Sequence, residues 1–416
     1  MTLRPLILKA REAKVKLSAS SGETRNTVLL SLASEIEAGE SLLLEANVKD
    51  QIKAQKEGLG PALIDRLTLT SQRIKALAKG IRETAFLPDP LGAIEDYRTL
   101  PSGLTVGRAR VPLGLILFIC EARPGAVAEA ASMALKSGNC IVIKPGKEAK
   151  ESSKVLGDFI LKSLGGLPSE SATILWDTPR EGILELLQQH DLIDLVIPRG
   201  GEGLIRYVSE NSRIPVLKHF KGVCHLYVDE TADLKMAVDI TLNAKANRPG
   251  TCNALECLLV HETIANEFFE ALIPQLLKHK IQVRAHQNVM SFFQGMEDWV
   301  RLAEPSDFGQ EFLDLILALK VVGSIDEALS HIQQYGSNHT ESIVTNDRSS
   351  ANRFLKEVDA GCVMVNASTR LNDGGCLGLG AEIGISTSKL QAYGPMGLLE
   401  LTTRKFVVLG EGHLRD

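Results

Sequence analysis

The sequence lacks the features that mark membrane, secreted and repeat proteins. No apolar run approaches the length of a membrane-spanning helix, and the first apolar stretch is too short for a secretory signal. Internal repeats and low-complexity tracts are absent as well. We therefore expect a cytoplasmic protein built from ordinary globular domains.

An excess of charge of one sign is also lacking. The 46 Lys and Arg residues nearly balance the 51 Asp and Glu residues, which leaves a formal net charge of −5 over 416 residues. So small a charge gives no reason to expect nucleic acid or a membrane surface as a partner, whereas an anionic small molecule stays compatible with it. With 44% hydrophobic residues, a chain of this length predicts two or three domains.

Cysteine pairs of the C-x-x-C type are missing. The seven cysteines are an odd number and most lie in apolar segments, which favours reduced thiols over disulfides. Cys224-His225 and the remaining histidines lack the spacing of a zinc site, so we expect no metal.

The apolar pattern predicts an α/β fold. Residues up to about Ala85 have helical spacing, and the segment 97–111 indicates two short strands around a turn at Pro101-Ser-Gly103. From Gly114 on, continuous apolar runs alternate with amphipathic segments, as in a doubly wound parallel sheet with helices on both faces. The first expected strands are 115–120, 140–143, 172–175, 192–197 and 214–217.

A second alternating block predicts a further α/β domain. Between Val283 and Asp307 the periodicity is poor, so we expect irregular structure there. The segment 401–409 is expected to be a strand that adds to the hairpin near Tyr97 of this or another subunit. The expected strands of the second block are 224–228, 256–260, 317–322, 342–345 and 363–366.

Cys252 is the leading candidate for a catalytic residue. It follows Arg248-Pro-Gly250, where a sharp turn can present the sulfur in a cleft. Arg248, Lys245 and the N–H groups of an expected following helix would favour the thiolate, which is the nucleophilic form. A buried structural cysteine is the alternative, because free cysteine is among the most buried residue types.

Three loops follow expected strands, at the edge where open parallel sheets bind ligands. One contains Arg199, Gly200 and Gly201, whose backbone N–H groups can approach a pyrophosphate, although an ordinary turn stays open as an alternative. Another begins with Lys144, which suits a ribose or its 2′-phosphate unless it is simply solvated. The third contains Arg123, which can clamp a phosphate or carboxylate or form a surface salt bridge.

The segment 365–385 follows an expected strand and is rich in glycine and small polar residues. With the exposed amides of its glycines, Asn366, Ser368, Thr369 and Arg370 can bind an amino-acid-like substrate. A merely flexible loop is the alternative.

Together these segments resemble the aldehyde dehydrogenase superfamily and, within it, the gamma-glutamyl phosphate reductases, also called glutamate-5-semialdehyde dehydrogenases. The resemblance covers essentially the whole chain. It is carried by the segments 197–201, 214–219, 222–229, 243–254, 322–343 and 390–398.

The resemblance implies three structural parts. These are a cofactor-binding domain of residues 1–95, 114–225 and 367–399, a catalytic domain of residues 226–366, and a β oligomerisation arm of residues 96–113 and 400–416. It also implies a homo-oligomer, a dimer or larger, and leaves open an association with glutamate 5-kinase.

The resemblance further implies roles for single residues. Cys252 is the expected nucleophile. The expected cofactor-binding residues are Lys144, Arg199, Gly200, Gly201 and Glu311, the last of which would hold the nicotinamide ribose. The expected substrate-binding residues are Arg123, His219, Asn253, Asn366, Ser368, Thr369 and Arg370.

Two positions depart from hydrolytic aldehyde dehydrogenases. Arg123 stands where those enzymes have an oxyanion-hole asparagine, and His219 stands where they have the glutamate that activates water. Both departures fit a reductase, because a water-activating base would hydrolyse the thioester before its reduction. Within the reductases, Cys376 and Leu377 replace a usual acidic residue and phenylalanine, which leaves the substrate contacts of that loop open.

The implied reaction is NADPH-dependent reduction of L-glutamate 5-phosphate to L-glutamate 5-semialdehyde and phosphate through a cysteinyl thioester, the second step of proline biosynthesis from glutamate. One alternative is a hydrolytic aldehyde dehydrogenase of the same fold. Another is a cofactor-free cysteine hydrolase or acyltransferase that pairs Cys252 with His219 or His225, but it leaves the alternating strands and their glycine turn unexplained.

Overall fold

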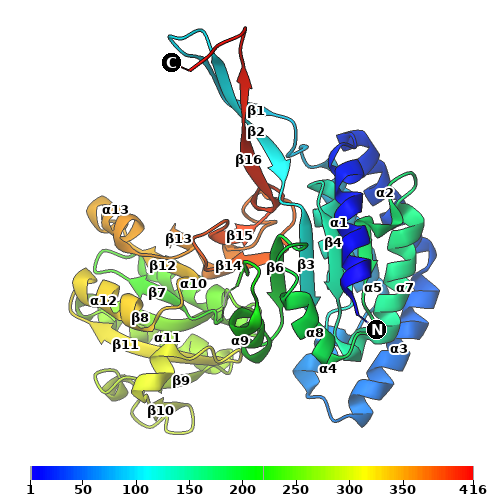
Figure 1. Ribbon diagram of the computed structural model, residues 1–416. Coiled ribbons are helices and arrows are strands. Elements are labelled where there is room, and N and C mark those ends of the chain that lie inside the picture. Colours follow the sequence, from blue (N-terminus) through cyan, green and yellow to red (C-terminus); the bar gives the residue numbers. More distant parts are fainter. Residues whose placement is uncertain (1, 219, 416) are drawn as a thin grey trace. The chain divides into compact units, whose positions relative to one another are not determined.

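A computed structural model describes residues 2–218 and 220–415 of the chain (Figure 1). The chain forms two compact units. The first comprises Met1–Lys218, Gly378–Gly384 and Met396–Asp416, and the second comprises His219–Leu377 and Ile385–Pro395. The second unit extends beyond the catalytic domain of residues 226–366 implied by the resemblance, because the segments after residue 366 partly pack with it.

The predicted helical lead-in is confirmed. Polar residues just before two of its helices cap their first turns, since Ser21 accepts the N–H of Thr24 and Thr70 accepts that of Arg73. The lead-in forms α1 (Arg4–Ser18), α2 (Gly22–Ala38), α3 (Glu40–Lys56), α4 (Pro61–Leu67) and α5 (Ser71–Phe86).

Three antiparallel strands form a separate sheet in the first unit. β1 (Ile94–Thr99) and β2 (Thr105–Pro112) make the predicted hairpin, and β16 (Thr402–Leu409) pairs with the whole of β2. The late strand therefore adds to the hairpin of its own chain. Figure 1 shows these strands extending as a ribbon beyond the helices of their unit.

The first unit also contains a parallel sheet of order β5-β4-β3-β6. Every residue of β3 is buried, as expected for a central strand covered on both faces. The strand order changes direction at β3, where β6 joins its other side, and such a switch point is where open α/β sheets bind ligands. The strands are β3 (Leu115–Cys120), β4 (Cys140–Lys144), β5 (Ala172–Ile174) and β6 (Leu195–Arg199), and the helices are α6 (Gly125–Lys136), α7 (Lys150–Ser163), α8 (Arg180–Leu187) and α9 (Glu202–Asn211).

The strand predicted at 214–217 is wrong. The structure has only an isolated bridge there, between Val196 and Val216. Pro215 has no N–H to donate, so the segment does not continue as a regular edge strand.

The second unit contains a seven-stranded parallel sheet of order β10-β9-β11-β8-β7-β12-β13. Its strands are β7 (Cys224–Val228), β8 (Leu255–His261), β9 (Gln282–Ala285), β10 (Val300–Leu302), β11 (Ile316–Val322), β12 (Thr340–Val344) and β13 (Cys362–Val365). Its helices are α10 (Leu234–Ala246), α11 (Ala265–Lys278), α12 (Ile325–Tyr335) and α13 (Arg348–Glu357). The prediction of irregular structure for 283–307 is wrong in part, because most of β9 and the whole of β10 lie in this segment. Strands this short contain too few alternations of apolar and polar residues to be detected in the sequence.

Side chains alternate along these strands and form one apolar core on each face of the sheet. Leu226 of β7 packs with Phe268 and Phe269 of α11 on one face. Tyr227 packs with Ala328 of α12 and Phe354 of α13 on the other face. The sheet of the second unit is therefore covered by helices on both sides, as in the first.

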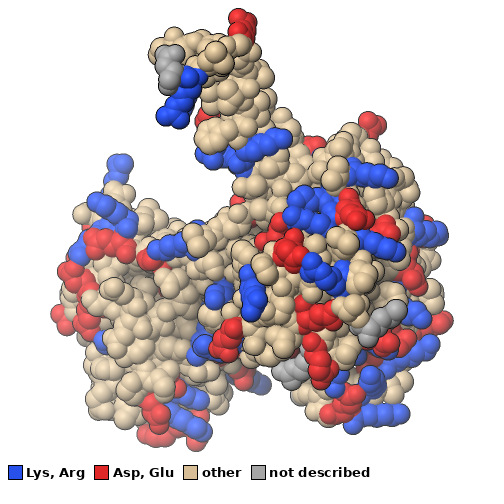
Figure 2. All heavy atoms as spheres, viewed as in Figure 1, with Lys and Arg blue, Asp and Glu red and all other residues tan. Residues whose placement is uncertain are grey.

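Other features are local. The short strands β14 (Gly384–Ser386) and β15 (Gly394–Met396) form a two-stranded sheet where the chain passes between the two units. On the face shown in Figure 2, basic and acidic side chains are interspersed over the first unit. No helix among the described residues combines the length and the apolar character needed to cross a bilayer.

Candidate active site

Cys252 lies in a turn between α10 and β8 of the second unit, and its side chain is partly exposed. The N–H of Thr251 donates to the carbonyl oxygen of Arg248 at 3.3 Å, so the chain turns where the Pro-Gly pair predicts. The helix expected after Cys252 is wrong. The chain enters β8 at Leu255 instead, so the thiol has no helix N-terminus behind it.

The carbonyl group of Cys252 is held from the side of β7. The Cys224 thiol donates to this oxygen at 3.2 Å. Gly222 approaches the same oxygen so closely that a Cβ at this position would lie 2.0 Å from it, which leaves room for glycine alone. These contacts fix the backbone that carries the thiol.

Arg370 is tied to both neighbours of Cys252. Its Nη1 donates to Thr251 Oγ1 at 3.0 Å and also to Asn253 Oδ1. Burial and the Arg248 cation lower the pKa of Arg370, whereas the Cys252 thiol acts in the opposite direction. A guanidinium group is therefore fixed close to the candidate nucleophile.

Other predicted substrate residues stand around Arg370. Asn253 Nδ2 donates to the backbone oxygen of Asn372 at 2.9 Å and so joins the cysteine loop to the loop after β13. Ser368 Oγ caps a short helical turn by accepting the N–H of Arg370. Thr369 Oγ1 is buried and has no hydrogen-bond partner among the described residues.

Two of the predicted substrate residues of the second unit are not placed at this cluster. Asn366 is held at the end of β12, where its amide exchanges two hydrogen bonds with the backbone of Thr345 at 2.9 and 3.0 Å. The structure therefore assigns it to bracing the loop. His219 lies outside the described residues.

Lys245, which was expected to face the thiol, is instead buried in an ion pair. Its Nζ lies 2.6 Å from Glu256 Oε2, and neither side chain is more than 1% exposed. Burial raises the pKa of Glu256 to about 7, although the nearby Lys245 opposes this shift. Of the two cations expected beside the thiol, Arg248 is the exposed one.

The predicted cofactor residues of the first unit meet at the carboxyl ends of neighbouring strands. Lys144 ends β4 and pairs in register with Ile119 of β3, and Arg199 ends β6 and pairs with Cys120. Burial lowers the pKa of Lys144, while the carboxylate of Glu148 opposes that effect. A partly buried cation therefore lies at the switch point of the sheet.

The turn at Gly200 and Gly201 leads into α9 and already holds an anion. A Cβ at Gly200 would lie 2.3 Å from Glu121 Oε2, so a side chain at this position would displace the carboxylate. The N–H of Gly201 donates to the same Oε2 at 2.8 Å. The amide of Gly201 therefore already binds an anionic oxygen within the chain.

The remaining predicted residues fall in different units. Arg123 follows β3 in the first unit, with Lys144 and Arg199. Glu311 lies in the second unit, in the loop before β11. The structure therefore groups one set of residues around Cys252 and another at the switch point of the first sheet.

Comparison with known proteins identifies relatives of the whole chain. Residues 3–291 match the aldehyde dehydrogenase family. Gamma-glutamyl phosphate reductase of Desulfatibacillum aliphaticivorans is 49% identical over 98% of this chain and 97% of its own length. The crystal structure of gamma-glutamyl phosphate reductase from Thermotoga maritima is 43% identical, has a TM-score of 0.96 and covers 100% of both chains. The chain belongs to the gamma-glutamyl phosphate reductase family.

As a member of the gamma-glutamyl phosphate reductase family, the protein is an oxidoreductase of proline biosynthesis with the aldehyde dehydrogenase fold. Aldehyde dehydrogenases use a nicotinamide cofactor. A more distant solved structure, an engineered glycolyl-CoA reductase with bound NADP⁺, is 17% identical with a TM-score of 0.69 and covers 98% of this chain and 96% of its own. At that identity it shares the fold alone.

Sequence reasoning missed some residues of the candidate site. Thr251 and Asn372 join the two loops, and each could have been found as a neighbour of a predicted residue, Cys252 or Arg370. Cys224 is 28 positions from Cys252, so no local pattern links them.

Proposed function

We propose that the protein reduces L-glutamate 5-phosphate to L-glutamate 5-semialdehyde and phosphate in the cytoplasm, with NADPH and through a thioester on Cys252. The observation that carries the proposal is the fixed guanidinium of Arg370 beside a partly exposed thiol. The names of the relatives supply the substrate.

Cys252 performs the covalent step. Its thiolate attacks the acyl carbon of the substrate, so that the S–C bond forms and the bond from carbon to the phosphate oxygen breaks. Phosphate leaves with the electron pair and needs no activated water. When bound, NADPH supplies the hydride that converts the thioester to the aldehyde and returns the thiolate.

Arg370 supports this step as a binding residue. A guanidinium group forms forked hydrogen bonds with carboxylates and phosphates, and a partly buried one binds more tightly than one in water. Thr251 and Asn253 hold it in position. We infer that Arg370 receives an anionic group of the substrate, with Arg248 as the exposed cation nearby and with Ser368 and Thr369 in the same loop.

The residues at the switch point of the first sheet fit a dinucleotide phosphate. Lys144 and Arg199 supply positive charge, Gly200 allows close approach, and the N–H of Gly201 already donates to a carboxylate. Binding there would exchange the Glu121 carboxylate for a phosphate oxygen. The roles of Arg123, Glu311 and His219 come from the resemblance alone.

The three-stranded arm supports a homo-oligomer. Its two edge strands are β1 and β16, and they expose Tyr97 (56%), Phe406 (67%) and Val408 (55%). Unpaired edges with exposed apolar side chains favour pairing with another chain. Association with glutamate 5-kinase rests on the reaction sequence, because that enzyme would supply an unstable acyl phosphate.

The test is the reverse reaction, followed by the absorbance of NADPH. Purified protein is given glutamate semialdehyde and NADP⁺, with or without inorganic phosphate. We expect NADPH to form only when phosphate is present. Formation without phosphate would instead establish hydrolytic oxidation, and thioester turnover without any dinucleotide would establish an acyltransferase.

A variant isolates the covalent step. Cys252→Ser should keep its fold and lose activity by orders of magnitude, because a hydroxyl is far less nucleophilic than a thiolate. Cys362→Ser in β13 is the matched control and should retain activity. Normal turnover by Cys252→Ser would rule out the thioester.

A further inference from the structure

The register of the second sheet gathers three chemically active side chains that are far apart in sequence. His225 of β7 is the direct partner of Cys257 on β8 and of Glu341 on β12. Side chains of paired residues in a parallel sheet point to the same face. His225, Cys257 and Glu341 therefore form one row across three adjacent strands.

A second histidine covers this row from the neighbouring helix. Cys257 belongs to the core that α12 and α13 cover, so its side chain points toward these helices. His331 is a buried residue of α12, and its Nε2 lies 3.6 Å from Cys257 Sγ. The rings of His225 and His331 meet edge to face, with centroids 5.6 Å apart.

One buried ring nitrogen of the cluster has a lone pair or a proton with no hydrogen-bond partner. His225 is completely buried, and its Nε2 has no hydrogen-bond partner within the described part of the chain. Its other ring nitrogen, Nδ1, lies 3.1 Å from Glu341 Oε2. A buried nitrogen left without a partner costs free energy, and a carboxylate behind a histidine is the usual support of a metal ligand.

We propose that His225, Cys257 and His331 form a binding site for a divalent transition metal, of which zinc fits best. Their ligand atoms all lie within 4.8 Å of one another. A tetrahedral zinc with these ligands needs about 3.5 Å between them, so small side-chain movements complete the geometry. One thiolate with two imidazoles is a donor set that suits zinc, and water would take the fourth position.

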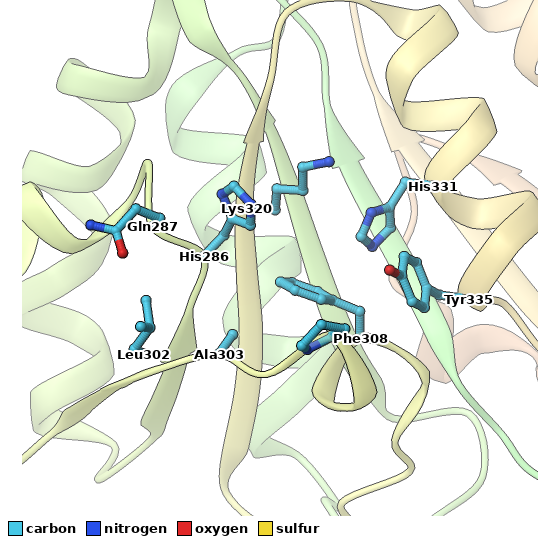
Figure 3. A pocket seen from close by; sticks show the side chains of 9 residues that line it. His286, Gln287, Leu302, Ala303, Phe308, Lys320, His331 and Tyr335 are labelled. Atoms are coloured by element: carbon cyan, nitrogen blue, oxygen red, sulfur yellow. The ribbon is translucent and has the colours of Figure 1, made fainter.

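The pocket shown in Figure 3 is lined by one residue of the cluster, His331. Its volume is about 280 Å³, and His331 and Tyr335 lie on one side of it, with His286, Phe308 and Lys320 also in its lining. The His331 ring packs edge to face against Phe308 and at a tilt against Tyr335, with ring centroids 5.1 and 4.7 Å away, so it is held in place. The same imidazole thus faces the pocket and reaches the buried row.

Metal binding would tie β7, β8 and α12 together, because the three proposed ligands lie on these three elements.

The experiment is a cobalt titration of the full-length protein. Cys252→Ser and Cys376→Ser form the background, because they remove the nucleophile and the exposed thiol as rival ligands. After treatment with a chelator, Co²⁺ should bind with one equivalent per chain and produce a thiolate-to-cobalt charge-transfer band with the strong visible bands of tetrahedral cobalt. Zn²⁺ should then displace it.

Three further variants in this background test the ligands. Cys257→Ser should abolish the charge-transfer band while circular dichroism stays unchanged, and Cys362→Ser, the matched control, should retain it. Glu341→Gln should weaken Co²⁺ binding by about 10 to 100-fold, as the loss of a supporting carboxylate does elsewhere. A band that persists in Cys257→Ser, or folded protein that binds no stoichiometric Co²⁺, would overturn the proposal. These readouts need no turnover, so they are independent of the proposed reaction.

Discussion

Lys245 and Glu256 form a buried ion pair across the loop that carries Cys252. Lys245 lies in the last turn of α10 and Glu256 near the start of β8, and Nζ and Oε2 are 2.6 Å apart. The other carboxylate oxygen, Oε1, accepts the N–H of Leu313 at 3.2 Å. The pair therefore joins both ends of the nucleophile loop to a third segment.

Removing one partner of this pair should destabilise the protein strongly. Lys245→Met leaves a buried carboxylate unpaired, and we expect the free energy of unfolding to fall by about 3 to 5 kcal/mol. The double variant Lys245→Met with Glu256→Leu should recover most of that loss, because no buried charge remains. Urea unfolding followed by circular dichroism measures both effects. Equal losses in the single and double variants would contradict the buried pair as their cause.

The pair should also make stability depend on pH. Glu256 has a pKa of about 7 when folded and an ordinary value of 4.5, so the folded state binds more protons between these limits. The stabilisation that comes from the protonated Glu256 is then complete below its ordinary pKa and is lost as the pH rises through its pKa in the folded state. Relative to Glu256→Gln, the wild type should lose stability from about pH 5 to 8, at no more than about 1.4 kcal/mol per pH unit. A parallel pH dependence in both proteins would argue against the raised pKa.

The fold was largely predictable because its strands are continuous apolar runs. The strands at 115–120 and 224–228 were predicted with their observed bounds, since burial on both faces leaves few polar residues in them. The errors have local causes. Pro215 interrupts the pairing of an otherwise apolar segment, and β9 and β10 are too short to show a period.

The candidate site was predictable only where its residues lie within one short segment of the sequence. Cys252 and Arg370 were proposed from the turn and the glycine-rich loop that contain them, and the structure brings these two segments together. The partner of Lys245 lies beyond the loop, and the row of His225, Cys257 and Glu341 depends on strand register. A linear spacing search does not detect such contacts.

Lys144 provides a test of the cofactor site. Lys144→Ala should raise the KM for NADPH by about 10-fold or more and change kcat less, because a charge-assisted hydrogen bond contributes about 1.5 to 3 kcal/mol to binding. Lys147→Ala is the matched control, since Lys147 is exposed on the same loop and pairs with Glu57. Steady-state kinetics with NADPH as the varied substrate measures both. An unchanged KM for NADPH would remove Lys144 from the site.

Arg370 provides the corresponding test of the substrate site. Arg370→Lys keeps the charge but loses the planar fork that contacts Thr251 and Asn253, so a lysine is expected to hold an anion poorly there. We expect the KM for inorganic phosphate or for the semialdehyde in the reverse reaction to rise by about 10 to 100-fold, according to which anionic group Arg370 receives. The KM for NADP⁺ should stay constant, because Arg370 belongs to the unit that carries Cys252 rather than to the one that carries Lys144.

Arg353→Lys on α13 is the control for replacing any arginine by lysine, because the Arg353 guanidinium pairs with Asp326 and Glu357. This variant should leave the KM values for phosphate, the semialdehyde and NADP⁺ unchanged. If Arg370→Lys altered the constant for NADP⁺ alone, its assignment to the substrate would fail.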